Sequence, residues 1–125
     1  DLPLPAYLEH FYQQDKIASF LCVQPSQSFH VVSMGEGGVV KGIEPVGNSD
    51  LWINGGFFVL DPAVIDLVDG DQCIWEQSPL QTLAEQDQLS AYHHSGFWQP
   101  MDTLRDKTLL EELWQNGQAP WKVWD

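Results

Sequence analysis

Apolar side chains recur in the first part of this chain with a helical spacing and then as a continuous run. Four residues near the start repeat every three or four positions: Leu4, Leu8, Phe11 and Tyr12. This spacing, with prolines in the first turn, predicts a helix over residues 4–14. Residues 17–23 form an unbroken apolar run that Pro25 ends, which is typical of a buried strand.

The middle of the chain has the pattern of extended segments. Residues 29–34 and 39–43 flank a glycine-rich stretch at 35–38, which predicts a β-hairpin. Residues 51–60 are apolar on both faces and are expected to form a central, covered strand. The polar sequence 54–56, Asn-Gly-Gly, interrupts this strand. Its two glycines predict either a bulge or a place where a ligand approaches the backbone, and the pattern favours neither.

Helical signals return in the second half. Asp61 and Pro62 are the N-cap and first residue of a short helix that extends to Val68, and the Ser-Pro at 78–79 begins another that ends at Glu85. A short strand follows at 89–93. A helical apolar stripe then begins at Thr103 and is stopped by Gly117 at the C′ position: Leu104, Leu109, Leu110, Leu113 and Trp114. The alternation predicts one α/β domain over 1–125, with an attached antiparallel hairpin.

The composition limits the classes of partner. Among 125 residues, 18 are acidic and 5 are Lys or Arg, giving a formal net charge of −13. Such a chain repels phosphate backbones and anionic membrane surfaces, so we expect neither nucleic acid nor a membrane as partner. Neither a membrane-spanning run nor a signal peptide is recognisable. Cys22 and Cys73 indicate two reduced thiols and a cytoplasmic protein. Because the first residue is Asp1 rather than Met, we expect a processed or truncated chain.

Two groups of possible metal ligands are better explained as surface residues. His93 and His94 are adjacent on a strand, so they are expected to point to opposite faces and cannot easily hold one metal ion. Four acidic residues lack the spacing of a calcium-binding loop and are interpreted as a solvated acidic rim: Asp61, Asp66, Asp69 and Asp71.

Asp102 has two possible roles. Pro100 disfavours a helix at Gln99, so Asp102 stands at a junction between an extended segment and a helix. An Asp at this position often caps the helix. Such a junction is also where α/β folds bind ligands. The spacing alone does not separate a cap from a ligand.

Four segments, in order along the chain, resemble glucose-1-phosphate cytidylyltransferases, which are sugar nucleotidyltransferases that join CTP and glucose 1-phosphate into CDP-glucose and pyrophosphate. They are WINGGFFVL (52–60), IWEQSPLQTLA (74–84), GFWQPMDTLRDK (96–107) and LEELWQNGQAPWKVW (110–124). The resemblance implies the carboxyl-terminal half of a Rossmann-like fold, a mixed sheet with flanking helices. It also implies that the nucleotide-binding loop and a first metal carboxylate lie in the other half.

The resemblance assigns roles to four residues. Asp102 matches a carboxylate that holds Mg²⁺ at the phosphates, while Glu44, Asn54 and Gly55 match positions that face the sugar. Two family cations are missing, because Pro45 and Ser28 stand where the family has Lys and Arg. These changes predict a different sugar, other groups at the phosphate, or weakened catalysis.

Two functional hypotheses follow. The first is an enzyme that makes a CDP-sugar, of which this chain alone would be inactive. The second is a non-catalytic sugar-phosphate-binding or assembly module derived from the same family. Trp121 and Trp124 near the end of the chain are expected to pack on the body or on a neighbour, which favours a homo-oligomer in either case.

Overall fold

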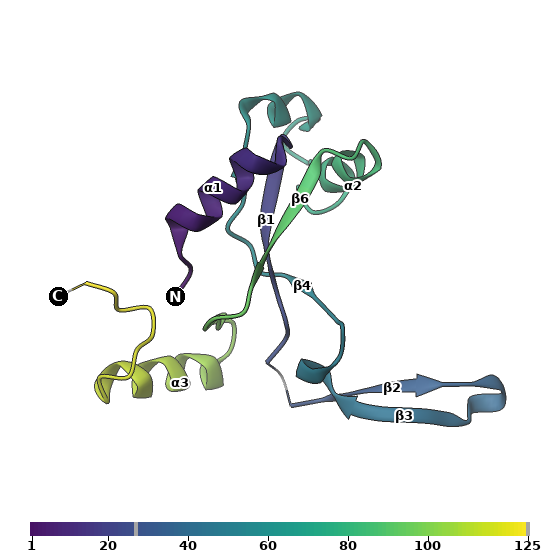
Figure 1. Ribbon diagram of the computed structural model, residues 1–125, viewed down its shortest axis with the longest axis vertical. Helices are drawn as coiled ribbons and strands as arrows, with labels where there is room; N and C mark the ends of the chain where they lie inside the picture. The colour runs from purple at the N-terminus through teal and green to yellow at the C-terminus, as the bar shows by residue number, and fades with distance from the viewer. Residues whose placement is uncertain (27, 125) are drawn as a thin grey trace. The chain divides into compact units, whose positions relative to one another are not determined.

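The computed structural model describes residues 1–26 and 28–124 and has the predicted alternation of helices and strands (Figure 1). The regular elements are α1 (Leu4–Gln14), β1 (Ala18–Val23), β2 (His30–Met34), β3 (Val40–Pro45), β4 (Ile53–Asn54), β5 (Val59–Leu60), α2 (Ser78–Glu85), β6 (Leu89–His94) and α3 (Leu104–Gln115). Three short 3₁₀ helices complete the set: η1 (Glu36–Gly38), η2 (Val46–Asn48) and η3 (Pro62–Leu67). The helices predicted at 4–14, 78–85 and from 103, the hairpin, and the strands around 17–23 and 89–93 are confirmed.

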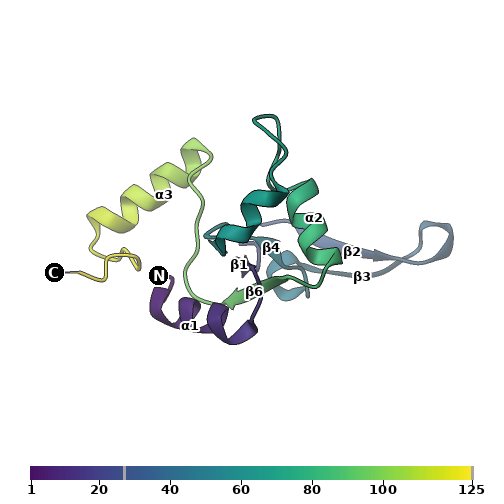
Figure 2. The ribbon, with the colours of Figure 1, turned by 90° about the horizontal axis from the view of Figure 1, so that it is seen from above.

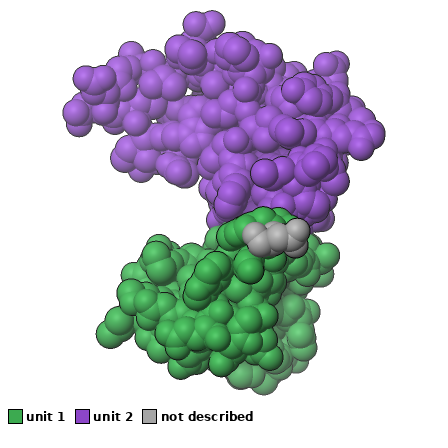
Figure 3. All heavy atoms as spheres, turned by 90° about the vertical axis from the view of Figure 1, so that its left-hand side faces the viewer, with its two compact units in different colours: residues 1, 23–53, 95–125 green, residues 2–22, 54–94 purple. Residues whose placement is uncertain are grey.

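The described residues divide into two compact units, which Figure 3 colours separately. Unit 1 contains residue 1, residues 23–53 and residues 95–124. Unit 2 contains residues 2–22 and 54–94. The prediction of a single domain over 1–125 stays a prediction, and each unit is described by itself below.

Strand β1 is the centre of a four-stranded sheet in which β4, β5 and β6 all pair with it. β5 is antiparallel to β1, with Ser19 opposite Val59. The prediction that residues 51–60 form one central strand is wrong. This segment is instead two short strands separated at residues 55–58, and both lie beside β1. Pairing to β1 continues across the gap, since the amide of Gly55 donates to the carbonyl of Leu21 (2.7 Å).

Unit 2 has helices on both sides of its sheet, as Figures 1 and 2 show for α1 and α2 on opposite sides of β6. On one side, α1 places the buried Tyr7 against Tyr92, with ring centroids 5.1 Å apart. On the other, Leu83 from α2 and Val64 from η3 pack with Ala18 in the buried core. The mixed sheet with flanking helices confirms the predicted α/β class.

Unit 1 contains the hairpin of β2 and β3, antiparallel with Val31 opposite Glu44 and a bulge at Ser33–Met34. The connecting residues 35–38 include two glycines with positive φ, as the glycine-rich turn predicted. One face of the hairpin is apolar and exposed: Val32, Met34, Val40 and Ile43.

Helix α3 of unit 1 begins after an N-cap at Thr103 and ends before Gly117, whose φ of 67° confirms the predicted C′ position. Its apolar stripe is confirmed as helical, yet none of its residues is buried. The rings of Trp121 and Phe97 pack against each other with centroids 5.6 Å apart, as expected if Trp121 packs on the body of the protein. Trp124, by contrast, is 57% exposed. No helix within residues 1–26 and 28–124 is long and apolar enough to cross a membrane.

Candidate functional site

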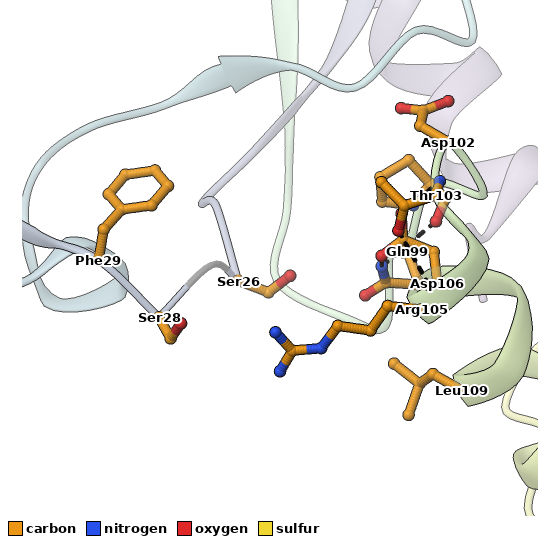
Figure 4. A pocket seen from close by; sticks show the side chains of 10 residues that line it. Ser26, Ser28, Phe29, Gln99, Asp102, Thr103, Arg105, Asp106 and Leu109 are labelled. Carbon is orange, nitrogen blue, oxygen red and sulfur yellow. Dashed lines mark hydrogen bonds between the residues drawn. The ribbon is translucent and has the colours of Figure 1, made fainter.

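A pocket of about 500 Å³ lies in unit 1, between the start of α3 and the segment that leads into the hairpin (Figure 4). Residues from 26–29 and from 99–109 line it: Ser26, Ser28, Phe29, Gln99, Pro100, Asp102, Thr103, Arg105, Asp106 and Leu109. Its volume falls within the usual range for small-molecule sites. The lining includes two carboxylates, one guanidinium and three hydroxyls, so the pocket can bind a polar ligand.

A capping box closes the start of α3 at the rim of this pocket. The Thr103 hydroxyl accepts from the Asp106 amide (3.2 Å), while the Asp106 carboxylate accepts from the Thr103 amide (3.0 Å) and hydroxyl (2.7 Å). Gln99 donates to the other oxygen of Asp106 at 3.0 Å. The Thr103 hydroxyl in particular holds the pKa of Asp106 below its ordinary value. Thr103 and Asp106 therefore satisfy the helix terminus between them.

Asp102 lies just outside this box. The hypothesis that Asp102 caps the helix is wrong, because Thr103 is the N-cap. The Asp102 side chain is exposed and lines the pocket, and no hydrogen bond from it to another described residue is present. The carboxylate is thus available to an incoming group.

The carboxylates in the pocket allow one protein ligand to a hard cation. The described part of the chain holds no group of three His, Cys, Asp or Glu side chains arranged around a common point. Asp106 is engaged by Thr103 and Gln99, which leaves Asp102 as the available carboxylate. Mg²⁺ fits such a donor set, since it is often held by one or two carboxylates and completes its octahedral shell with water and substrate phosphates.

Glu44 also belongs to unit 1, but it does not line the pocket. It is exposed on β3, in register with Val31 of β2. The structure therefore does not bring Glu44 into the group of side chains around Asp102.

Asn54 and Gly55 belong to unit 2, at the break between β4 and β5. The Asn54 side chain accepts a hydrogen bond from the amide of Gly56 (2.8 Å), which folds the chain back on itself. Gly55 is buried, and its neighbours Gly56 and Phe57 have φ of 78° and 52°. This Asn-Gly-Gly sequence thus coincides with a break between two strands, with the exposed Asn54 at its edge, and its interpretation as a place where a ligand approaches stays a prediction.

A buried tyrosine holds this break in place, and sequence reasoning missed it. The hydroxyl of Tyr7, 1% exposed, donates to the carbonyl of Phe57 at 2.7 Å. Phe57 is a non-glycine residue with positive φ, a conformation that costs free energy and needs support from its surroundings. Burial raises the pKa of Tyr7, so its hydroxyl stays protonated as a donor. Neither the helical spacing of α1 nor the apolar run at 51–60 signals this contact.

The residues that were interpreted as structural have structural environments. His93 is exposed and His94 is 7% exposed, so the two point to opposite faces of β6 as predicted. The four acidic residues of the predicted rim are all exposed, and Asp61 caps η3 by accepting from the Ala63 amide (2.9 Å). Both cysteines are free thiols.

Comparison with solved structures identifies the fold. No protein-family model matches the chain. A crystal structure from Bacillus anthracis, described as a glucose-1-phosphate thymidylyltransferase, superposes with a TM-score of 0.63 at 14% identity and covers the whole chain but 52% of that protein. At this identity the likeness concerns the fold alone, and that fold is the one found in sugar nucleotidyltransferases.

Comparison with curated proteins shows which sugar nucleotidyltransferases this chain resembles in sequence. Glucose-1-phosphate cytidylyltransferase of Salmonella typhimurium is 47% identical over all 125 residues, which are 49% of its own length. A Bacillus subtilis protein described as the same enzyme is 41% identical over 90 residues. The resemblance to the carboxyl-terminal half of glucose-1-phosphate cytidylyltransferases is thereby confirmed. The chain spans about half the length of the curated relatives it matches.

Proposed function

We propose that this chain is the sugar-side part of a sugar nucleotidyltransferase that converts CTP and a sugar 1-phosphate into a CDP-sugar and pyrophosphate. In this reaction an oxygen of the sugar phosphate attacks the α-phosphorus of CTP. The bond from that phosphorus to the oxygen of the β-phosphate breaks, and pyrophosphate leaves with the electron pair. The 47% identity to the Salmonella enzyme over the whole chain is the observation that carries this proposal.

Asp102 is proposed to hold Mg²⁺ at the reacting phosphates. A bound Mg²⁺ neutralises charge on the phosphates as the new bond forms and the old one breaks. This proposal is supported by the structure of the start of α3, where Thr103 and Asp106 cap the helix while the Asp102 side chain lines the pocket. The role of Asp102 is to present one carboxylate to the metal.

The sugar-binding roles carried by the resemblance are also proposals. Asn54 and Gly55 lie at the break between β4 and β5, where the exposed side chain of Asn54 offers a polar group to a sugar hydroxyl and Gly55 beside it has no Cβ. Glu44 is proposed as a carboxylate acceptor for the sugar. Pro45 and Ser28 bring no cation to the phosphate, so the 1-phosphates of sugars other than glucose are also candidate substrates. Rates of turnover with each sugar 1-phosphate distinguish among them.

The test is turnover by the complete protein that carries this chain. The purified protein is incubated with Mg²⁺, one nucleoside triphosphate (CTP, UTP, GTP or dTTP) and one sugar 1-phosphate at a time, and pyrophosphate release is measured. We expect release with CTP that stops when Mg²⁺ is chelated. A folded protein that releases pyrophosphate with no pair of substrates, yet binds a sugar 1-phosphate, would support the non-catalytic binding module instead.

Two further expectations accompany the proposal. A cytoplasmic location is proposed because both cysteines are free thiols, as is usual in a reducing compartment. A homo-oligomer is proposed because α3 and the last residues leave large apolar side chains exposed, including Trp114 (50%) and Trp124 (57%).

A further inference from the structure

Arg105 brings the positive charge to the pocket of unit 1. It is the one Lys or Arg among the described residues that line this pocket, in a chain with five such residues in all. Arg105 is exposed, and its side chain leaves α3 toward the side of the pocket formed by Ser26 and Ser28 (Figure 4). Its guanidinium therefore faces the pocket space rather than a protein carboxylate.

The nearest acidic neighbours do not neutralise Arg105 by direct contact. Asp106 follows it in sequence and feels its charge, but the two oxygens of Asp106 accept hydrogen bonds from Thr103 and Gln99. Asp102 points away from Arg105 in Figure 4. Within the described ranges, no ion pair joins Arg105 to either carboxylate. The five N–H donors of the guanidinium are thus available to a ligand.

Serine hydroxyls stand on the facing side of the pocket. Ser26 and Ser28 are both exposed and both line it, and hydroxyls complement a guanidinium in binding the oxygens of a phosphate. A free volume of about 500 Å³ is large enough for a phosphorylated sugar. The donor set and the space are those of an anion-binding site.

We propose that Arg105 binds a phosphate group of a phosphorylated substrate in this pocket, with Ser26 and Ser28 as further hydrogen-bond donors. The proposal rests on the proposed function, since it names a phosphate ligand for the same site. A net charge of −13 disfavours any approaching phosphate, so a local cation is needed in addition to a metal ion at Asp102. The phosphate can belong to the sugar 1-phosphate or to CTP, and the experiment separates these two sources.

The experiment compares three variants of the complete protein: Arg105→Gln, Arg105→Lys and Lys107→Gln. Lys107 is the matched control because it is two positions along the same helix, does not line the pocket and pairs with Glu111. Binding of glucose 1-phosphate, CTP and inorganic phosphate is measured by calorimetry with Mg²⁺ present, and KM and kcat are measured for each substrate. Thermal melting checks that each variant folds.

Arg105→Gln is expected to weaken binding of inorganic phosphate and of one of the two substrates by about tenfold to a hundredfold, the range for losing a charged hydrogen bond. A selective rise in KM for glucose 1-phosphate assigns the site to the sugar phosphate, and a selective rise for CTP assigns it to the nucleotide. Arg105→Lys should recover part of the binding, since it restores the charge but not the planar fork. Lys107→Gln should bind like the parent protein.

The failures of the two proposals are distinguishable. A parent protein that binds inorganic phosphate in an Arg105-dependent way but makes no nucleotide sugar sinks the proposed function and leaves Arg105 as a phosphate ligand. An active parent protein whose Arg105→Gln variant keeps the parent binding constants, or is matched by Lys107→Gln, overturns the role of Arg105. A protein that binds none of the three probes also overturns it.

Discussion

Replacing Asp102 with Asn separates the two roles that this residue could have had. The substitution keeps the size and hydrogen-bonding shape of the side chain but removes the charge that would hold Mg²⁺. The substitution should not change the stability of the start of α3, because the capping hydrogen bonds are made by Thr103 and Asp106. Asn also caps about as well as Asp, so even a residual capping role would be silent in this variant.

Substitution of Asp102 should affect turnover, whereas substitution of the N-cap Thr103 should affect stability. We expect Asp102→Asn to lower turnover of the complete protein by about a hundredfold or more, the scale of losing one charge-stabilising group. Its melting temperature should stay within about 2 °C of the parent, as for an exposed polar substitution. Thr103→Ala, by contrast, removes the N-cap and should cost about 1 kcal/mol of unfolding free energy. In a chain of this size that lowers the melting temperature by about 4 °C.

The assay is a Mg²⁺ titration of pyrophosphate release at saturating substrates, run beside thermal melting. Asp66→Asn is the control, since Asp66 is an exposed carboxylate on η3 in the other unit. The Asp102 variant should require a higher Mg²⁺ concentration and have a lower maximum, while the control matches the parent. Parent-like activity with an unchanged Mg²⁺ requirement in Asp102→Asn would remove Asp102 from the metal site.

Three further outcomes follow from the same structure. The 125-residue chain alone should release no pyrophosphate from CTP and sugar 1-phosphates, because it spans 49% of its Salmonella relative, and clear turnover would contradict this. Tyr7→Phe removes the 2.7 Å hydrogen bond to the carbonyl of Phe57, which should lower the free energy of unfolding by about 1 kcal/mol. It should also raise KM for the sugar phosphate more than it lowers kcat, and an unchanged KM would show that the break beside Asn54 does not contact the sugar. Asp106 has a lowered pKa in the folded chain, so its stabilisation of α3 is complete above the ordinary carboxyl pKa of about 4 and is lost as pH falls through the folded pKa. The Asp106→Asn variant should lack this loss of stability in melting curves recorded at acid pH, and the same pH dependence in the variant and the parent would contradict the assignment.

The elements that the sequence predicts well are those that local signals determine. Residues 4–14 carry a full helical repeat, and α1 has these bounds in the structure. Gly117 ends α3 because the C′ position needs a positive φ that glycine adopts without strain. In both places the information lies within a few residues along the chain, so it is found without knowledge of any tertiary contact.

The conformation of segment 51–60 escapes prediction because it depends on distant residues. Its apolar run favours one buried strand, yet the break at 55–58 is held by hydrogen bonds to Leu21 in β1 and by the hydroxyl of Tyr7 in α1. Those partners are more than thirty positions away in the sequence. The pattern within one segment does not register a hydrogen bond made by another, so β1 rather than this segment is the centre of the sheet.

The pocket is predictable only in part. Asp102 stands out through its resemblance to a metal carboxylate, and Ser28 stands out only as a position where the family has a cation. Arg105 and Ser26 do not stand out, since the segments that contain them meet only when unit 1 folds. One local signal bears directly on the site. Thr103 followed three positions later by Asp106 has the spacing of a capping box, which favours Thr103 over Asp102 as the N-cap, a signal that the position of Pro100 does not carry.

The capping box explains how two carboxylates four positions apart can have opposite chemical availability. Asp106 accepts hydrogen bonds through both of its oxygens, so both are already engaged in stabilising the first turn of α3. Asp102 precedes the N-cap, where the backbone is not yet helical and offers its carboxylate no partner among the described residues. The helix start thus fixes the direction of one acid and leaves the other to the pocket. An Asp placed before a capping box of this kind is positioned by the helix without being used by it, and this is the property that a metal-binding carboxylate requires.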